Sequence, residues 1–274
     1  MLANNPLKQF FRRPSIYLKL PSGGEGYSTE VLSMTETGEV PVYPMTAIDE
    51  ITVRTPDALY NGTAIVELIK SCVPAIKDPW QVKSIDVDAI LLAIKSCSQG
   101  NDLEVESTCP ACTEAATYGV NLIGMLQNIK KVDYSTPLRL GEMEIKFRPL
   151  IYKEMSVAGK HQFELQKVFS NMQALPEEER PAKMHEAVVS VTAITMDLLS
   201  QTIEYIKIKD MVVTQTEFIL EFLQNCDKNI YVEIRDYHGK LKDQSKLEPQ
   251  KIKCIHCQHE YSQDIVINQS DFFG

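Results

Sequence analysis

Two short stretches, Cys109-Pro-Ala-Cys112 and Cys254-Ile-His-Cys257, decide the fold of this chain. Each cysteine pair lies between short runs that are typical of strands, so each is expected in the turn of a β-hairpin, which we call a knuckle. Two knuckles together supply four thiolates, the ligand set of a structural zinc ion. Roughly 140 residues separate the pairs, whereas a compact ribbon needs about 15 to 20. The zinc ion is therefore expected to join the middle of the chain to its C-terminus.

Two other readings of the cysteines remain open. In one, the pairs are unrelated surface thiols. In the other they carry out dithiol redox catalysis, which requires a Cys-x-x-Cys that opens a helix; neither pair clearly opens one. Ribbon knuckles commonly carry glycine after the second cysteine, whereas Thr113 and Gln258 stand there. His256 and His259 are further potential ligands, although four sulfurs already complete the coordination shell.

The composition is typical of a soluble globular protein in one large domain or two smaller ones, with 274 residues, 44% apolar and 24% charged. The net charge of -9 repels phosphate backbones, so nucleic acid is not an expected partner. The longest apolar run, 89–94, is too short to cross a bilayer, and no membrane contact is expected. The first residues lack a signal-peptide core. This predicts a reducing cytosol, where the seven cysteines are thiols or metal ligands.

Residues 1–54 are expected to form an N-terminal arm and a β-hairpin. Strand-like runs at 15–20 and 40–43 flank a glycine-rich turn. The arm that precedes them is basic and carries Phe10 and Phe11. Two readings of the arm stay open: a frayed terminus, or an arm whose aromatic side chains dock on a partner.

Residues 55–100 are expected to form a pair of helices. Thr55-Pro56-Asp57 has the features of a helix start, and Ser84 opens the second helix. Apolar residues follow at helical spacing, namely Ile65, Leu68, Ile69 and Cys72 in the first helix and Val87, Ile90, Leu91 and Ile94 in the second. Cys72 and Cys97 are expected in the core. Residues 101–121 and 243–274 are then expected to form the zinc-ribbon-like element.

Residues 122–242 are expected to form a hairpin plus helical domain. It comprises a short helix over 122–129, a hairpin over 138–148, long helices from Tyr152 and after Pro181, and a third helix. The second long helix has an apolar side made of Met184, Ala187, Val188, Val191, Ile194 and Leu198. Thr214-x-x-Glu217 matches a capping box that starts the third helix, whose Phe218, Leu220, Phe222 and Leu223 are expected in the core. The stretch 229–242 is strand-like.

The predicted fold class is therefore α+β. It consists of a mostly helical body with short β-hairpins and a two-knuckle, four-cysteine zinc-ribbon-like element that closes the C-terminus onto the middle of the chain. The pattern contains no catalytic constellation. Asp49-Glu50 is interpreted as a solvated turn, Asp86 and Asp88 as part of a helix first turn, and His161, His185 and His238 as exposed. An enzyme is disfavoured.

One longer pattern resembles a known family. It consists of 38–50 (GEVPVYPMTAIDE), 54–62 (RTPDALYNG), 71–80 (SCVPAIKDPW), 84–88 (SIDVD) and the first knuckle. This pattern, over roughly residues 15 to 130, resembles the baseplate hub protein family of T-even-like contractile-tailed bacteriophages. The resemblance implies a structural component or assembly factor of the baseplate hub, with other phage tail proteins as partners. It also implies location in the virion or, during assembly, in the host cytoplasm, and oligomers only within the tail assembly.

The prolines of this pattern suggest a docking surface. Stiff loops lose little conformational entropy on binding, so we expect partner contacts through Tyr43, Met45 and Trp80, with help from Phe10 and Phe11. The alternative is that these loops are only well-packed connections. A second functional class is a cytosolic zinc-ribbon adaptor that contacts nucleic acid. It is less favoured because acidic residues around the first knuckle oppose Lys251 and Lys253.

Overall fold

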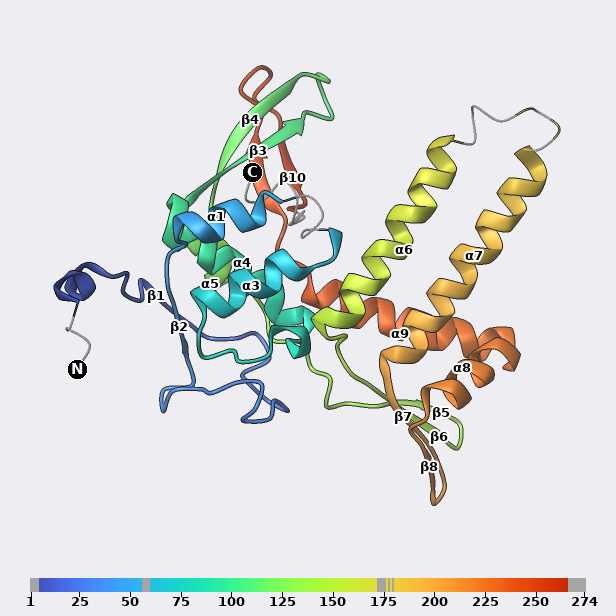
Figure 1. Cartoon of the computed structure of the whole chain (residues 1–274). Coiled ribbons are helices and arrows are strands. Elements are labelled where there is room, and N and C mark those ends of the chain that lie inside the picture. The colour runs from blue at the N-terminus through green and yellow to red at the C-terminus, as the bar shows by residue number, and fades with distance from the viewer. Residues whose placement is uncertain (1–4, 56–59, 172–175, 177, 179, 266–274) are drawn as a thin grey trace. The chain divides into compact units, whose positions relative to one another are not determined.

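The computed structural model describes residues 5–55, 60–171, 176, 178 and 180–265 (Figure 1). The chain divides into two compact units: unit 1 comprises 1–131 and 246–274, and unit 2 comprises 132–245. Helices combine with short antiparallel sheets, which confirms the predicted α+β class. Among the described residues, no helix has the length and apolar character that crossing a membrane requires.

Unit 1 begins with the predicted arm and hairpin. A short 3-10 helix, η1 (Pro6–Phe10), is followed by strands β1 (Ile16–Leu18) and β2 (Val40–Val42), which pair antiparallel with Leu18 opposite Val40. Pro41 lies opposite Tyr17. The side chains of Val40 and Val42 are fully buried, so the hairpin forms part of the core of unit 1.

The body of unit 1 is helical, with α1 (Ala47–Val53), α3 (Thr63–Cys72), the 3-10 turn η2 (Pro79–Gln81), α4 (Ser84–Gln99) and α5 (Leu122–Gln127). The apolar stripes predicted for α3 and α4 are buried, as are Ala89, Leu92 and Ala93 on the remaining sides of α4. Cys72 is fully buried and Cys97 partly buried, in agreement with their expected place in the core. Pro56 and Asp57 of the predicted helix start lie outside the described residues.

The interpretation of Asp49-Glu50 as a solvated turn is wrong, because both residues lie in the first turn of α1. The backbone amide of Thr46 donates to Asp49, and the amide of Asp49 donates back to the Thr46 hydroxyl. This reciprocal arrangement is a capping box, which satisfies amides that have no partner within the helix. Burial by itself raises the pKa of Asp49, but the hydrogen bonds from Thr46 and Ser71 and the charge of Arg12 outweigh it and lower that pKa.

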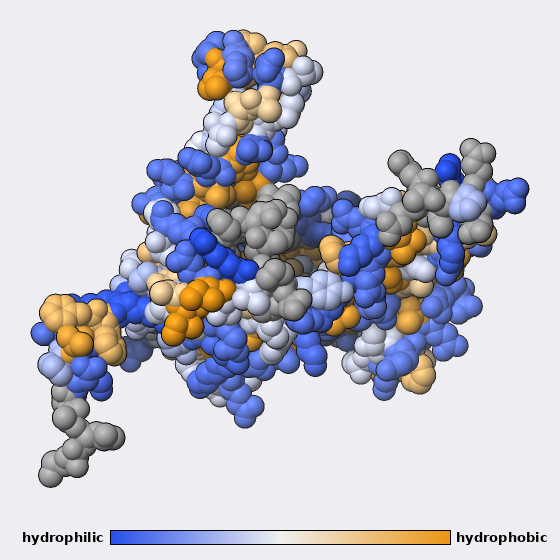
Figure 2. Space-filling model, turned by 45° about the horizontal axis from the view of Figure 1, so that its top comes forward, coloured by the Kyte–Doolittle hydropathy of each residue, from blue (hydrophilic) through white to orange (hydrophobic). Residues whose placement is uncertain are grey.

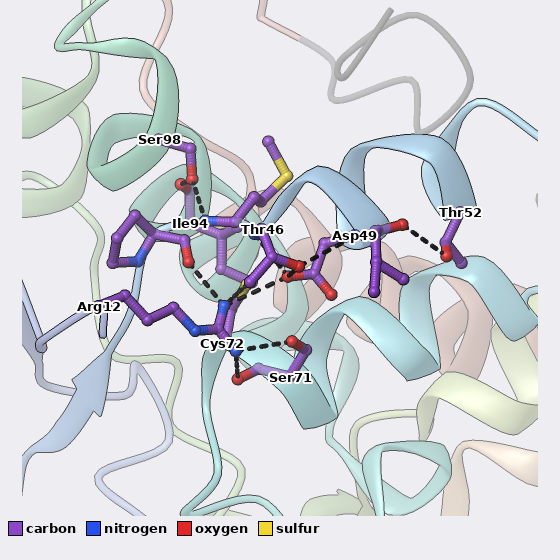
Figure 3. A network of polar contacts seen from close by, with 11 residues as sticks. Arg12, Thr46, Asp49, Thr52, Ser71, Cys72, Ile94 and Ser98 are labelled. Carbon is purple, nitrogen blue, oxygen red and sulfur yellow. Dashed lines mark hydrogen bonds and ion pairs between the residues drawn. The ribbon is translucent and has the colours of Figure 1, made fainter. Parts of the chain in front are cut away.

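Arg12 fixes the arm to the helices of unit 1 (Figure 3). Its guanidinium donates to the carbonyl of Pro44 at 2.6 Å, to Asp49 Oδ2 at 3.2 Å, and to the carbonyl and hydroxyl oxygens of Ser71, both at 2.8 Å. One side chain therefore joins the chain before β1 to the N-terminus of α1 and the last turn of α3.

Asp86 lies in the first turn of α4, as predicted, but it is completely buried. It accepts hydrogen bonds from the backbone amide of Ser22 at 2.8 Å and from the hydroxyl of Tyr27 at 2.6 Å. The Tyr27 oxygen in turn accepts from the amide of Lys83 at 2.7 Å. These contacts attach the glycine-rich loop after β1 to the N-terminus of α4.

Unit 2 is built on a four-stranded antiparallel sheet in the order β5 (Leu138–Leu140), β6 (Met143–Phe147), β7 (Ile203–Ile208) and β8 (Met211–Val213). Helices α6 (Tyr152–Asn171) and α7 (Arg180–Gln201) lie between β6 and β7 in sequence, and α8 (Thr216–Asn225) and α9 (Lys228–Ser245) follow β8. Buried residues from the sheet and helices form one core that includes Ile145, Phe147, Ile206, Ile219 and Ile234.

The strand predicted over 229–242 is wrong, because this segment forms helix α9. Its β-branched and aromatic residues resemble a strand, but Ile230, Ile234, Tyr237 and Leu241 recur at helical spacing and pack into the core of unit 2. His238, expected to be exposed, is partly buried, with its ring stacked on Phe147 at a centroid distance of 6.1 Å. Burial, aided by the charge of Lys242, lowers the pKa of His238.

Two expectations for helices α7 and α8 need correction. The capping box at Thr214 does not form, because α8 begins one residue later than this pattern requires, with Gln215 as its N-cap and no side-chain cap. Phe218, expected in the core, is 60% exposed, whereas Leu223 is buried as expected. Helix α7 forms where predicted, but within its apolar side only Ala187 is fully buried, while Met184, Val188 and Val191 are exposed.

Candidate metal centre

The two knuckles are the turns of two separate hairpins of unit 1. Strands β3 (Asp102–Thr108) and β4 (Ala115–Asn121) pair antiparallel along their whole length and carry the first knuckle. Strands β9 (Gln250–Lys253) and β10 (Glu260–Gln263) carry the second. Each cysteine pair thus lies in the turn of a hairpin, as the sequence predicts.

The four cysteine sulfurs converge on one point. Cys109 Sγ lies 3.7 Å from Cys257 Sγ, and Cys112 Sγ lies 3.7 Å from Cys254 Sγ. All four sulfurs lie within 4.8 Å of one another, and among the described residues no histidine or carboxylate joins this cluster. The two pairs are remote in sequence but adjacent in space, so the C-terminal hairpin closes onto the middle of the chain.

These sulfur distances suit a tetrahedral metal ion. A zinc–sulfur bond of about 2.3 Å puts neighbouring sulfurs of a regular tetrahedron about 3.8 Å apart, close to the 3.7 Å of the two cross-hairpin contacts. A disulfide bond requires about 2.05 Å, and the cysteines are free thiols. The spacing fits four ligands around one ion and does not fit a pair of disulfides.

The backbones of the two knuckles follow the same hydrogen-bond pattern. In the first, the amide of Cys109 donates to the carbonyl of Glu114 at 3.0 Å, and the Cys109 carbonyl accepts from the amide of Thr113 at 2.9 Å. In the second, Cys254 makes the equivalent bonds at 2.9 and 3.0 Å. The amide of Ala111 also points at the sulfur of Cys109, at 3.4 Å. This repeated turn holds both sulfurs of a pair toward the same side.

The residue after each second cysteine adopts a left-handed backbone. Thr113 has φ of 61° and Gln258 has φ of 62°, and only one further non-glycine residue in the described ranges, Lys209, has positive φ. This conformation favours glycine and costs other residues roughly 1 kcal/mol or more. The missing glycines therefore do not prevent the knuckles from forming. They leave each knuckle strained.

Four ionised thiols in this cluster would need a cation to offset their mutual repulsion. Backbone amides of Cys257 and His256 and contacts with neighbouring sulfurs lower the pKa of Cys254 to about 6. At Cys112 the amide of Glu114 lowers the pKa, but burial and the surrounding sulfurs outweigh it and raise that pKa to about 12. Four thiolates this close would repel one another, so a divalent ion that bound here would displace the remaining thiol protons.

Polar contacts between the two hairpins support the cluster. The hydroxyl of Ser107 on β3 donates to Gln263 Oε1 on β10 at 2.7 Å, and the hydroxyl of Tyr261 donates to Ser107 at 3.0 Å. His259 stacks on Tyr261 with ring centroids 6.3 Å apart, and His256 is exposed. The histidines near the second knuckle therefore flank the four-sulfur cluster without belonging to it.

Comparison with protein-family models matches the chain to the T4 bacteriophage base plate protein family over residues 13–274. The chain belongs to this family. The match includes both knuckles and both units, so it confirms the resemblance read from residues 15 to 130 and extends it to nearly the whole chain. Comparisons with curated proteins and with solved structures gave no match.

The residues expected to bind partners of this base plate protein lie in two parts of unit 1. Phe10 and Phe11 on the arm are 77% and 59% exposed. Tyr43 and Met45 lie in the connection from β2 to α1, and Trp80 lies in η2; all three are partly buried. The amide of Tyr43 donates to the carbonyl at the end of α3, and its ring lies 5.9 Å below the Arg12 guanidinium.

Sequence reasoning missed the role of Arg12 and Asp49 in this region. Thr46-x-x-Asp49 is a variant of the capping-box pattern with aspartate in the last position, and this was the available signal. The contact of Arg12 with Asp49 has no such signal, because it joins residues 37 positions apart. The arm of this base plate protein is therefore held at Arg12, while the two phenylalanines before it are exposed.

Proposed function

We propose that this phage baseplate protein is a non-enzymatic component or assembly factor of the baseplate hub, and that it acts by binding other hub proteins. The observation that carries the proposal is the family match over residues 13–274. The bacteriophage tail is accordingly its place of action, with a preceding stage in the host cytoplasm during assembly. The hub role itself follows from the resemblance of residues 15 to 130.

The proposed cofactor is one structural zinc ion, bound by Cys109, Cys112, Cys254 and Cys257. Thiolate ligands select zinc among the common divalent ions, and four of them leave no open position for water or substrate. A closed shell supports a structural rather than a catalytic ion. The ion would join the hairpins β3–β4 and β9–β10 within unit 1, where their sulfurs already lie within 4.8 Å.

Elemental analysis tests the metal. We expect about one zinc per chain in protein purified without chelator, loss of that zinc in Cys254→Ser, and a lower melting temperature of this variant. Cys226→Ser is the matched control, because Cys226 is a partly buried thiol of unit 2 outside the cluster. A Cys254→Ser protein that keeps its zinc and its melting temperature contradicts the site.

The proposed partner surface of unit 1 comprises Tyr43, Met45 and Trp80, with contributions from Phe10 and Phe11. Purification from infected cells should recover other tail proteins with the chain. Trp80→Ala should weaken that complex by about 2 kcal/mol while the protein stays folded and metal-loaded. Phe218→Ala, which removes an exposed aromatic ring from unit 2, serves as the control. Recovery of no tail protein, or normal baseplates in a phage that lacks this gene, contradicts the proposal.

A further inference from the structure

A groove of about 310 Å³ lies between helices α6, α7 and α8 of unit 2. Its walls are largely apolar, with Val157 and Ala158 from α6, Ile194 and Leu198 from α7 and Leu220 from α8. This volume is at the lower end of the range for binding sites, about 300 to 1,000 Å³. The groove is therefore suited to one or two side chains of a docking segment.

The groove carries a negative charge beside its apolar walls. Glu154 is neutralised by Arg148, which binds it through two nitrogens at 2.7 and 3.1 Å. Asp197 accepts a hydrogen bond from Gln201 at 2.8 Å, and within the described part of the chain no basic side chain pairs with it. An apolar groove edged by such a carboxylate favours a segment that is both hydrophobic and basic.

The helices around the groove also present apolar residues to solvent. Helix α7 has no charged residue from 187 to 196, and Val188 and Val189 there are 51% and 53% exposed. On α6, Val157 is 48% exposed. Helices α6 and α7 lie side by side (Figure 1). Exposed apolar side chains on such a pair are typical of a protein–protein interaction site.

The N-terminal arm has the complementary chemistry. Leu7, Phe10 and Phe11 are 61%, 77% and 59% exposed, and Lys8 and Arg13 add positive charge. Figure 2 shows a hydrophobic patch over this segment, at the lower left of the view. Side chains three apart lie on one side of a 3-10 helix, so Leu7 and Phe10 form one apolar edge. Because Arg12 fixes the chain behind them, the arm is presented as a preformed segment.

We propose that the arm of one copy, residues 6–13, docks in the α6–α7–α8 groove of a neighbouring copy. Leu7 and Phe10 would fill the apolar groove, and Lys8 or Arg13 would face Asp197. We choose a neighbouring copy as the occupant because its arm offers the exposed apolar side chains and the positive charge that complement this groove. Docking of the arm in the groove of its own chain would instead leave the protein monomeric. The contact joins two different surfaces, so it is head-to-tail and can continue from copy to copy. This self-association proposal rests on the proposed hub role only because that role assigns the chain to a repeating assembly. It differs from the expectation that oligomers form only within the tail, since it predicts that the isolated protein also forms them.

Light scattering after size-exclusion chromatography of the full chain tests the proposal over a concentration series. The wild-type protein should form dimers and larger species as its concentration rises. The arm variant F10A/F11A and the groove variant V157K/D197K should each stay monomeric at concentrations at least tenfold higher. A mixture of the two variants should form dimers and nothing larger, because one intact arm and one intact groove remain. Val189→Lys, which adds a charge to α7 outside the groove, should behave like the wild type.

Three outcomes overturn the proposal. The first is a wild-type protein that is monomeric at every concentration. The second is a groove variant that still self-associates, which would indicate pairing through another surface. The third is a mixture of variants that forms no dimer. Failure in any of these leaves the proposed hub role standing, because that role is tested by recovery of other tail proteins and not by self-association.

Discussion

Helices α4 and α7 carry similar apolar patterns but meet different surroundings. In α4, Val87, Ile90, Leu91 and Ile94 are at most 1% exposed, and the helix packs against α3, α5, β1 and β2. Helix α7 packs against α6, α8 and β7, and Met184, Val188 and Val191 on its apolar side are 45%, 51% and 38% exposed. The difference teaches that helical periodicity predicts which face is apolar, whereas the neighbouring elements decide whether that face is covered.

The largest contrast between the two helices is expected from loss of an aliphatic side chain. Ile90→Ala in α4 should lower the free energy of unfolding by about 2 to 5 kcal/mol, because it leaves a cavity in a packed core. Val188→Ala in α7 should change it by less than about 0.5 kcal/mol. Calorimetry of both variants measures the difference, and equal costs would show that the α7 face is covered in solution.

The next contrast concerns aspartates on the same two helices. Asp86→Ala in α4 should cost about 2 to 3 kcal/mol, because the Ser22 amide and the Tyr27 hydroxyl lose their buried acceptor. Asp197→Ala in α7 removes an exposed carboxylate and should cost less than about 0.5 kcal/mol. Urea denaturation followed by the fluorescence of Trp80, the single tryptophan, reports on unit 1 for Asp86→Ala. A cost below about 1 kcal/mol there would contradict the role given to Asp86.

Asp88 on α4 should make the stability of the protein depend on pH. Burial raises the pKa of Asp88 on α4 to about 6, above its value of about 3.9 in an unfolded chain. Between about pH 4 and 6 the folded state therefore binds more protons than the unfolded state. Protonation of Asp88 increases the free energy of unfolding as pH falls through that window, and this contribution is lost as pH rises through about 6. Asp88→Asn should stabilise the protein by about 1 to 2 kcal/mol at pH 8, since Asp88 keeps some exposed surface, and by nothing near pH 4. Urea titrations at both pH values measure it; a pH-independent gain would exclude titration as its cause.

The smallest effects are expected at strained turns, which both units contain. Thr113→Gly and Gln258→Gly in unit 1 and Lys209→Gly in unit 2 should each stabilise the protein by about 0.5 to 1 kcal/mol, because glycine accepts their positive φ. Melting temperatures of the metal-loaded protein test the three variants. If the knuckle variants destabilise while Lys209→Gly stabilises, the knuckle side chains have a role beyond the turn.

Features set by local spacing were predictable from the sequence. The Cys-x-x-Cys pairs predicted both knuckles, and the stripe from Val87 to Ile94 predicted α4, because their signals lie within one element. The resemblance read from residues 15 to 130 also predicted the family now matched over 13–274. These local signals do not predict which other helices and strands pack against each element.

The failures share one physical cause, which is that packing between distant elements decided the outcome. In α9, aromatic and β-branched residues favour a strand locally, but Ile234 and Leu241 are buried by a helix against the core of unit 2. Asp49 became part of a buried network only because Arg12 reaches it across 37 positions. The exposure of Val188 likewise depends on which elements pack against α7, and the sequence of α7 alone does not predict them.

The two knuckles are synthesised far apart in time, so the four-cysteine cluster can form only late in synthesis of the chain. The second knuckle follows the first by more than half the length of the chain, and all of unit 2 lies between them. A nascent chain released before Cys254 has only two of the four sulfurs, so it cannot form the four-sulfur cluster. Closing so long a loop costs about 4 kcal/mol for a flexible chain, and less once unit 2 has folded and shortened the path. Loading of the proposed metal ion is therefore expected late, when Cys254 and Cys257 have been synthesised, and chains that end before Cys254 should not bind it.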